Sequence, residues 1–163
     1  MAFDFTKLVT DRTASDFAYW LELRNKGFDK MSATEKTRWE TGNMKGAYNA
    51  GDLTRVGTAL NYLRDRLNTC GYITYPMWFE ARTDWNNASI PTSTDLTHYL
   101  KCVATIREAI VQAPTTPPTP TDTGALDYNE ANDIEKILYN TETLINNMIA
   151  ALFFCNDLYC GEV

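Results

Sequence analysis

Apolar residues recur every three or four positions in three separate stretches of the chain, and this spacing constrains the fold most. The clearest stretch contains Leu53, Val56, Leu60, Leu63 and Leu67. Such spacing aligns the side chains on one narrow stripe of a helix, suited to packing against a second helix. We therefore predict a helix over 49–67, capped by Asn49 or Asp52 and ended by Gly71.

Two more stretches repeat this spacing, over 93–111 and 130–155. The first has apolar residues at Leu96, Tyr99, Leu100, Val103, Ile106 and Ile110. The second has them at Ile134, Ile137, Leu138, Ile145, Met148, Ile149 and Leu152. Hydroxyl side chains at 92–94, and Asp127 or Asn129, are suitable N-caps for these helices. Three amphipathic helices predict a mainly α fold, a bundle in which the stripes face one another.

One or two shorter helices are expected before the bundle. Thr13 precedes Asp16 by three residues, and Ser32 precedes Glu35 by the same spacing. A hydroxyl residue followed three positions later by an acid is a capping-box pattern that marks a helix start. Gly27 and Gly42 follow the two segments and are natural stops.

Gly57 lies inside the helix expected over 49–67, where a glycine costs about 1 kcal/mol relative to alanine. A glycine at this position therefore needs a structural reason that outweighs its cost to the helix. We predict that a neighbouring backbone or ring approaches the helix closely at this position.

The periodicity changes after this helix. Ile73, Tyr75, Met77 and Phe79 alternate with more polar or turn-forming residues. A period of two is a strand signal, and Pro76 would confine such a strand to an edge. The sequence thus predicts a short β arm or hairpin near 72–82.

The 163 residues suggest a single helical domain, 1–163. A Pro/Thr-rich connector at 113–127 interrupts it, with four prolines and five threonines in the sequence APTTPPTPTDTGALD. Prolines at this density oppose a helix and favour an extended connection.

The charge distribution argues against several classes of partner. The formal net charge is −6, and residues 114–163 contain eight acids and one base. Nucleic-acid binding needs clustered Lys and Arg, which are absent here, so no nucleic-acid partner is expected. No apolar run reaches the roughly 18–20 residues of a membrane span, and the N-terminus lacks the order of a secretory signal.

The cysteines are Cys70, Cys102, Cys155 and Cys160, and no CxxC pair occurs. With a single histidine, His98, the chain offers no standard zinc-ligand set. We expect four reduced cysteines that act as small apolar residues, with no metal and no cofactor.

Catalytic motifs are equally sparse, and we expect no enzyme. No GxSxG, phosphate-binding loop or GxGxxG is present, and His98 reads as a surface or boundary residue. One alternative stays open, because Glu80 and Asp84 lie near Trp78 and Trp85 and could form a glycan-hydrolysing pair.

The acids after the connector also have two interpretations. Asp122, Asp127, Glu130 and Asp133 could gather a hard cation, but their spacing lacks the alternation of an EF-hand loop. A solvated acidic helix start explains them better, since the helix dipole favours carboxylates there.

Two aromatic clusters are candidate assembly contacts, since aromatic residues are enriched at protein–protein interfaces. They could equally cover the edge of the bundle. The residues are Tyr75, Trp78, Phe79 and Trp85 in the first cluster, and Phe153, Phe154, Leu158 and Tyr159 in the second.

Several segments in this order resemble a known group of proteins. They are TDRTASD (10–16), KGAYNAGDLTRVGTALNYLRDRL (45–67), TDW (83–85), IPTSTDLTHYL (90–100), YNEANDIEKIL (128–138) and DLYCGE (157–162). The ordered set covers nearly the whole chain. It resembles small helical proteins and domains of phages and prophages of Gram-positive gut bacteria, encoded among tail, baseplate and fibre genes.

The resemblance implies a virion structural role in the tail, with no catalytic residues. It implies a homo-oligomer that also binds other tail proteins, made in the host cytoplasm and carried in the virion. Two alternatives are a small cell-wall glycan hydrolase and a host-directed binding or adaptor protein.

Overall fold

A computed structural model describes residues 2–42, 44–70, 76–86, 88–121 and 126–159, with side chains through residue 151. The fold is mainly helical, as predicted, and no β-strand occurs among these residues. The α-helices are α1 (Ala14–Lys26), α2 (Ala33–Glu40), α3 (Ala50–Cys70), α4 (Ser93–Glu108) and α5 (Tyr128–Tyr159). Short 3-10 turns occupy Phe5–Lys7 and Phe28–Lys30.

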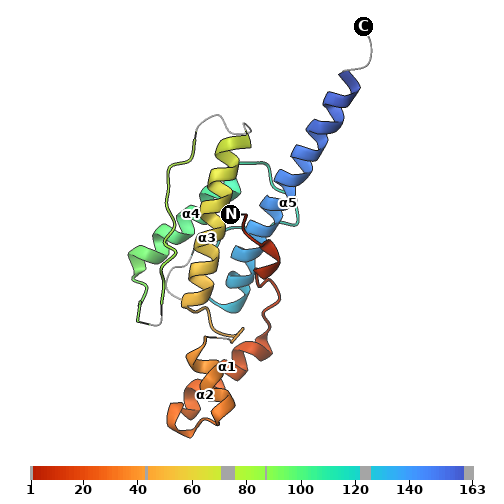
Figure 1. Ribbon diagram of the computed structural model, residues 1–163. Helices are drawn as coiled ribbons and strands as arrows, with labels where there is room; N and C mark the ends of the chain where they lie inside the picture. The colour runs from red at the N-terminus through yellow and green to blue at the C-terminus, as the bar shows by residue number, and fades with distance from the viewer. Residues whose placement is uncertain (1, 43, 71–75, 87, 122–125, 160–163) are drawn as a thin grey trace.

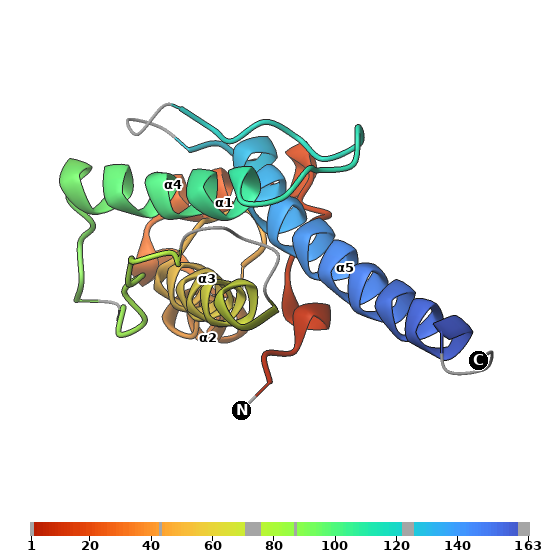
Figure 2. The ribbon, with the colours of Figure 1, turned by 90° about the horizontal axis from the view of Figure 1, so that it is seen from above.

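Helices α3, α4 and α5 pack against one another and form what we call the bundle (Figures 1 and 2). The stripe predicted on α3 is its buried face, with Leu60, Leu63 and Leu67 fully inaccessible to solvent. Fully burying one such side chain stabilises the fold by about 1.5–3 kcal/mol. Val103 and Ile106 of α4, with Ile134, Ile137, Leu138 and Ile145 of α5, complete the core.

The two short helices form a hairpin, α1–α2, that lies beyond the N-terminal end of α3 (Figure 1). Both predicted capping boxes are present: Thr13 with Asp16 and Ser32 with Glu35. Gly27 ends α1 with a φ of 76°, a conformation that favours glycine. Local sequence therefore fixes where both helices begin and where α1 ends.

The β arm predicted near 72–82 is not formed over 76–82, and its first residues lie outside the described part of the chain. Residues 76–86, which we call the arm, instead run extended along α3. Two asparagines of α3 bind its backbone reciprocally. Asn68 pairs with Met77 at 2.8 and 3.1 Å, and Asn61 pairs with Ala81 at 2.8 Å in both directions.

Between these pairs, the guanidinium of Arg64 donates to the carbonyl oxygen of Phe79. Asn61, Arg64 and Asn68 share one face of α3, while residues 77, 79 and 81 share one edge of the extended arm. Helix side chains thus satisfy the backbone groups that a second strand would satisfy in a hairpin. This explains why a strand-like alternation occurs here without a sheet.

Gly57 lies where the backbone of Arg82 in the arm packs against α3. A Cβ built on Gly57 would overlap the carbonyl oxygen of Arg82. The close approach predicted from the sequence is therefore confirmed, and the neighbour is backbone.

The described parts of the Pro/Thr-rich connector, 113–121 and 126–127, contain no helix, and residues 113–121 pack on α4 and α5. Arg107 Nε donates to the carbonyl oxygen of Pro117 at 2.8 Å, and Asn140 Nδ2 donates to the hydroxyl of the buried Thr116 at 2.9 Å. Side chains of both helices therefore fix the path of the connector.

The hairpin contains an ion pair that should be visible in a titration. Lys26 Nζ donates to both carboxylate oxygens of Glu35 at 2.9 Å, and together with Ser32 it lowers the pKa of Glu35 from 4.5 to about 2. The stabilisation from ionised Glu35 is therefore present above pH 4.5 and is lost as the pH falls towards 2.

In Lys26→Met we expect the pKa of Glu35 to rise, because the hydrogen bond from Lys26, which lowers this pKa most, is removed. NMR titration of the Glu35 carboxyl carbon measures this. Lys30→Met, which removes a lysine that forms no ion pair with Glu35 in the described structure, is the matched control. An unchanged Glu35 pKa in Lys26→Met would contradict the ion pair.

Candidate functional site

Two segments connect the hairpin to the bundle, residues 8–13 and 41–49, and we call them the junction. They bind each other through Lys45 Nζ and Asp11 Oδ2, 2.6 Å apart. Asn49 Nδ2 donates to the carbonyl oxygen of Gly42 at 2.6 Å, while its Oδ1 accepts from the first backbone N–H groups of α3. Gly46 lies against the carbonyl oxygen of Asp16, where a Cβ would overlap it.

A buried ionic network lies beneath the junction. Glu135 Oε1 accepts from Arg12 Nη2 at 2.6 Å and from Arg55 Nη2 at 2.8 Å. Its Oε2 accepts from the backbone N–H of Val9 at 2.7 Å and from Arg55 Nε at 3.2 Å. Asp52 Oδ1 accepts from Arg12 Nη2 at 3.0 Å and from Arg55.

The network brings two positive and two negative side chains together where water is largely excluded. Glu135 is fully buried, and Arg12 and Asp52 are 4% and 6% exposed. A buried ion pair adds little stability compared with apolar residues of similar size. Removing one partner of the pair, however, destabilises the fold by several kcal/mol, because the other charge stays buried without a partner. The network therefore fixes how the junction, α3 and α5 meet.

Two tyrosines extend the network. The Arg12 guanidinium lies 5.4 Å from the centre of the Tyr48 ring, and the Tyr48 hydroxyl bonds the Tyr99 hydroxyl of α4. Burial is the largest cause that raises the pKa of both phenols far above the ordinary value of 10. Both stay protonated near neutral pH, so they act as structural hydrogen-bonding groups.

A pocket of about 530 Å³ opens between the hairpin and the bundle, and we call it the junction pocket. Trp20 of α1 and Trp39 of α2 form one side, and the start of α3 forms the other. Asn86 and residues 89–91 complete its rim. The residues that line it are Trp20, Trp39, Glu40, Gly42, Met44, Ala47, Tyr48, Asn49, Ala50, Leu53, Asn86, Ser89, Ile90 and Pro91.

The polar groups in the junction pocket are largely used within the protein. Both the nitrogen and the oxygen of the Asn49 side-chain amide are hydrogen-bonded, and the side-chain oxygen Oδ1 of Asn86 accepts from the backbone N–H of Ala88 at 2.9 Å. What remains is mostly ring, thioether and aliphatic surface, from Trp20, Trp39 and Met44 above all. A pocket of this size and character can bind an apolar or aromatic group.

The candidate assembly residues of the arm have different environments. Trp78 is 89% exposed, whereas Phe79 is half-buried with the Arg64 guanidinium 5.7 Å from its ring centre. Trp85 is 9% exposed and belongs to the core, with Arg82 stacked 4.0 Å from its ring centre. Of these three, Trp78 alone presents its ring to solvent, and Trp85 is not a surface contact in this fold.

The side chains of the other five candidates lie outside the described part of the structure. Tyr75 lies outside the described residues. Phe153, Phe154, Leu158 and Tyr159 lie on the last turns of α5, of which the structure describes the backbone. These turns extend away from the bundle (Figures 1 and 2).

The glycan-hydrolase alternative relied on Glu80 and Asp84, and both side chains are exposed. The Asp84 carboxylate bonds Arg82 Nε at 2.6 Å, which lowers its pKa. A general acid for glycoside hydrolysis needs a raised pKa, so Asp84 lacks the environment for that role. Glu80 lines a shallow cleft beside Trp78, and Asp84 does not.

The other titratable candidates serve structural bonds. Asp127 and Glu130 cap α5 reciprocally at 2.8 and 2.9 Å, in agreement with a solvated helix start. His98 is exposed, and its Nε2 lies 3.0 Å from the carbonyl oxygen of Glu80. Cys70 and Cys102 are free thiols, and burial raises the pKa of Cys102 to about 11, so its thiol stays protonated.

Sequence reasoning missed the central residue of the ionic network and the two tryptophans of the junction pocket. Glu135 stands among Ile134, Ile137 and Leu138 on the buried face of α5, and an acid inside an apolar stripe was an available signal. Nothing comparable identified Trp20 and Trp39 as a pair, because they lie on separate helices and meet only in the folded chain.

No helix in the described part of the chain combines the length and the apolar character needed to cross a membrane. No known protein family, curated protein or solved structure matches the chain.

Proposed function

We propose that this chain is a structural subunit of a phage virion, in the tail, baseplate or fibre, and that it acts by protein–protein assembly. The tail context rests on the segment order described above, which resembles helical proteins encoded among phage tail genes. The assembly role rests on one structural observation, the free end of α5.

Helix α5 leaves the core before it ends. Ile145 is fully buried and Ile149 is half-buried, but Ala150 and Ala151 are exposed. The helix continues to Tyr159, so about ten residues, or about 15 Å at 1.5 Å per residue, extend beyond the bundle. No other described element accompanies them in either view (Figures 1 and 2).

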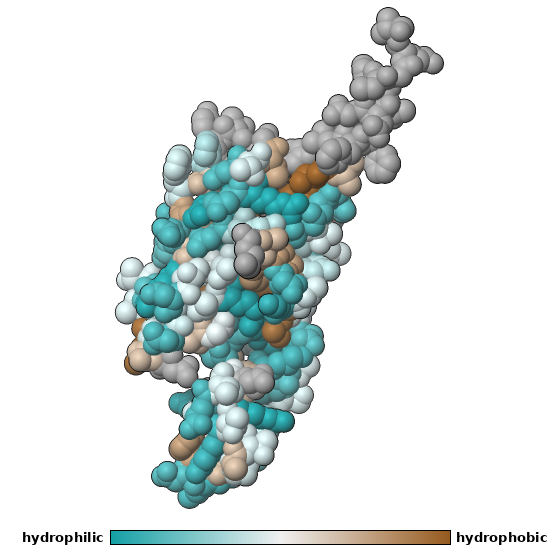
Figure 3. Space-filling view, viewed as in Figure 1, coloured by the Kyte–Doolittle hydropathy of each residue, from teal (hydrophilic) through white to brown (hydrophobic). Residues whose placement is uncertain are grey.

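The sequence of this free end is too apolar for a helix that is surrounded by water. Residues 148–159 read MIAALFFCNDLY and contain one charge, Asp157. A helix that is apolar around most of its circumference is normally buried. Figure 3 shows a largely hydrophilic face on the body, with hydrophobic surface where α5 leaves it and further hydrophobic spots elsewhere. A partner that covers this end would bury the apolar surface.

Light scattering and mass photometry on the purified full-length chain test the proposal. We expect concentration-dependent oligomers that Phe154→Asp weakens at least tenfold, because a charge would enter the covered apolar surface. Asn156→Asp adds the same charge to the same turns but keeps the apolar residues, so it should associate nearly as the wild type does.

Mass spectrometry of purified phage particles tests the location, and the chain should be present in stoichiometric amount. A strictly monomeric chain at high concentration that is also absent from particles would refute the proposal.

A further inference from the structure

The exposed ring of Trp78 and the junction pocket lie at opposite ends of α3. Met77, next to Trp78, binds Asn68 near the C-terminal end of the helix. The pocket is lined by Ala50 and Leu53 of its first turns. The intervening helix rises roughly 20 Å or more at 1.5 Å per residue. Trp78 therefore cannot reach the pocket of its own chain.

The two features are chemically complementary. Trp78 is 89% exposed, and its indole is a large apolar group left in water. The junction pocket presents the Trp20 and Trp39 rings and the Met44 thioether around about 530 Å³, which falls within the roughly 300–1,000 Å³ usual for binding pockets. Aromatic rings favour edge-to-face and offset contacts with one another, and sulfur contacts ring edges favourably.

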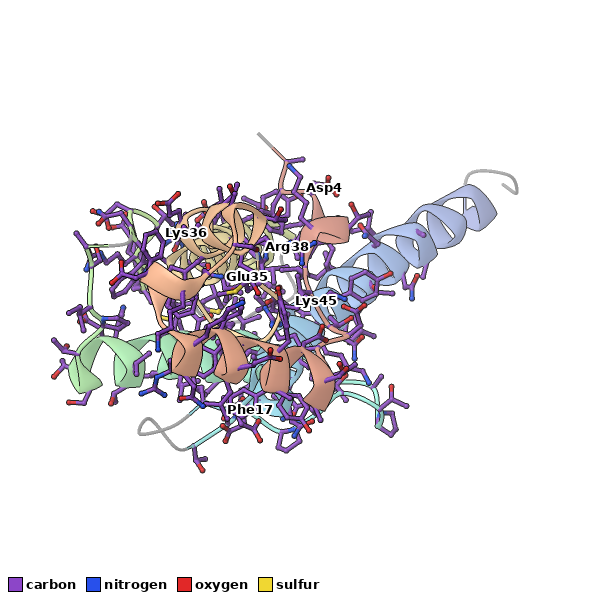
Figure 4. All side chains as sticks on the ribbon, turned by 90° about the horizontal axis from the view of Figure 1, so that it is seen from below. Asp4, Phe17, Glu35, Lys36, Arg38 and Lys45 are labelled. Carbon is purple, nitrogen blue, oxygen red and sulfur yellow. The ribbon has the colours of Figure 1, made fainter. Side chains whose placement is uncertain are left out.

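The two regions also differ in net charge. Residues 14–46, which contain the hairpin, have six bases and five acids, whereas the rest of the chain has nine bases and sixteen acids. Figure 4 shows Lys36 and Arg38 on the α2 side of this hairpin. Arg38 lines a neighbouring cleft that shares Met44 with the junction pocket, and Glu40 lines the pocket itself. The cleft beside Trp78 is lined by Arg64, Asp65 and Glu80 and carries one net negative charge, because Arg64 pairs with Asp65.

We propose that Trp78 of one copy inserts into the junction pocket of a second copy, between Trp20 and Trp39. The inference rests on the proposed assembly function and names a contact distinct from the free end of α5. Tryptophan is one of the residue types enriched at interface hot spots, which lie in desolvated pockets. Because the two surfaces differ, the contact is heterologous, and its repetition produces an open chain or a closed ring of subunits.

A photocrosslinking experiment on the full-length chain tests this contact. Trp78 is replaced by p-benzoylphenylalanine, which keeps a large aromatic group at an exposed position. Isotopically labelled and unlabelled chains are mixed and irradiated, and mass spectrometry locates the crosslinks. We expect crosslinks between labelled and unlabelled chains, from position 78 to the segments that contain Trp20, Trp39 and Met44.

Ile90→Asp is the control for specificity. Ile90 lines the junction pocket and is 86% exposed. The change therefore places an acid at the mouth of the pocket without disturbing the core. It should reduce the pocket crosslinks at least tenfold. Val111→Asp is the matched control, since Val111 is 96% exposed and does not line the pocket.

Crosslinks that form elsewhere in an associated sample, or that are unchanged in Ile90→Asp, would overturn the Trp78 contact and leave the α5 assembly role intact. A chain that stays monomeric in light scattering and gives no intermolecular crosslink would overturn both.

Discussion

Replacing Arg12 with methionine is expected to lower the free energy of unfolding by about 3–5 kcal/mol, the usual cost of breaking a buried ion pair. The arginine links Asp52 of α3 and Glu135 of α5, and its Nη1 donates to the carbonyl oxygen of Val9 at 2.6 Å. Without it, two nearly inaccessible carboxylates share the single cation of Arg55. The remaining negative charge then lacks a counter-ion among side chains that are almost fully buried.

Urea unfolding followed by circular dichroism measures this loss. Lys45→Met is the control, because the Lys45–Asp11 pair joins side chains that are 46% and 72% exposed. Exposed pairs contribute roughly 0–1 kcal/mol, so this variant should remain close to the wild type. Equal small losses in the two variants would mean that water reaches the Arg12 network.

Replacing Gly57 with alanine is expected to cost about 2–3 kcal/mol, at the upper part of the range for an overpacked site. Helix propensity alone predicts a gain of about 1 kcal/mol for this change. The added methyl would overlap the Arg82 carbonyl oxygen, and that oxygen belongs to a backbone held on both sides of the contact. The arm pairs with Asn61 through Ala81 and with Thr54 through the Trp85 carbonyl oxygen, so it cannot retreat without breaking hydrogen bonds.

Gly51→Ala tests the same substitution on the same helix where the surface is exposed. A Cβ there would lie 3.1 Å from Asn49 Oδ1, a side-chain atom that needs to shift by only a few tenths of an ångström, so we expect a change within about 1 kcal/mol of zero. Thermal unfolding of the two variants separates crowding from propensity. A Gly57→Ala protein as stable as the wild type would show that the arm moves freely from α3.

The helical part of the fold could be predicted because its signals are local. Capping pairs such as Ser32 with Glu35, and stripes such as the one from Leu53 to Leu67, act within a few residues of chain. Gly57 could also be interpreted, since a costly residue in a strong helix requires a compensating contact. The sequence indicated that something approaches there but could not say that it is the Arg82 backbone.

The arm was predicted incorrectly over 76–82 for a tertiary reason. An alternating pattern of apolar and polar residues indicates an extended backbone, and the arm is extended. The pattern does not indicate which groups bind that backbone, and here they are a row of side chains on α3. Asn61, Arg64 and Asn68 have helical spacing, yet polar residues on an exposed helix face are ordinary, so they carried no separate signal.

The junction could not be predicted because its groups are far apart in sequence. Arg12 and Glu135 meet across 123 residues. Pairing a cation with a particular anion at that separation requires the packing of α3 against α5, and no local rule supplies it. The same holds for the pocket between Trp20 and Trp39, whose shape depends on how the hairpin is attached.

This separation has a consequence for the order of events on the ribosome. The hairpin can close as soon as its own residues emerge, since its caps and the Lys26–Glu35 pair lie within α1 and α2. Its anchoring to α5 must wait for nearly the whole chain, because Val9 and Arg12 bind a carboxylate that is translated 126 and 123 residues later. A nascent chain stalled before residue 135 would therefore lack this anchor, and Asp52 would be the carboxylate of the network that Arg12 can bind.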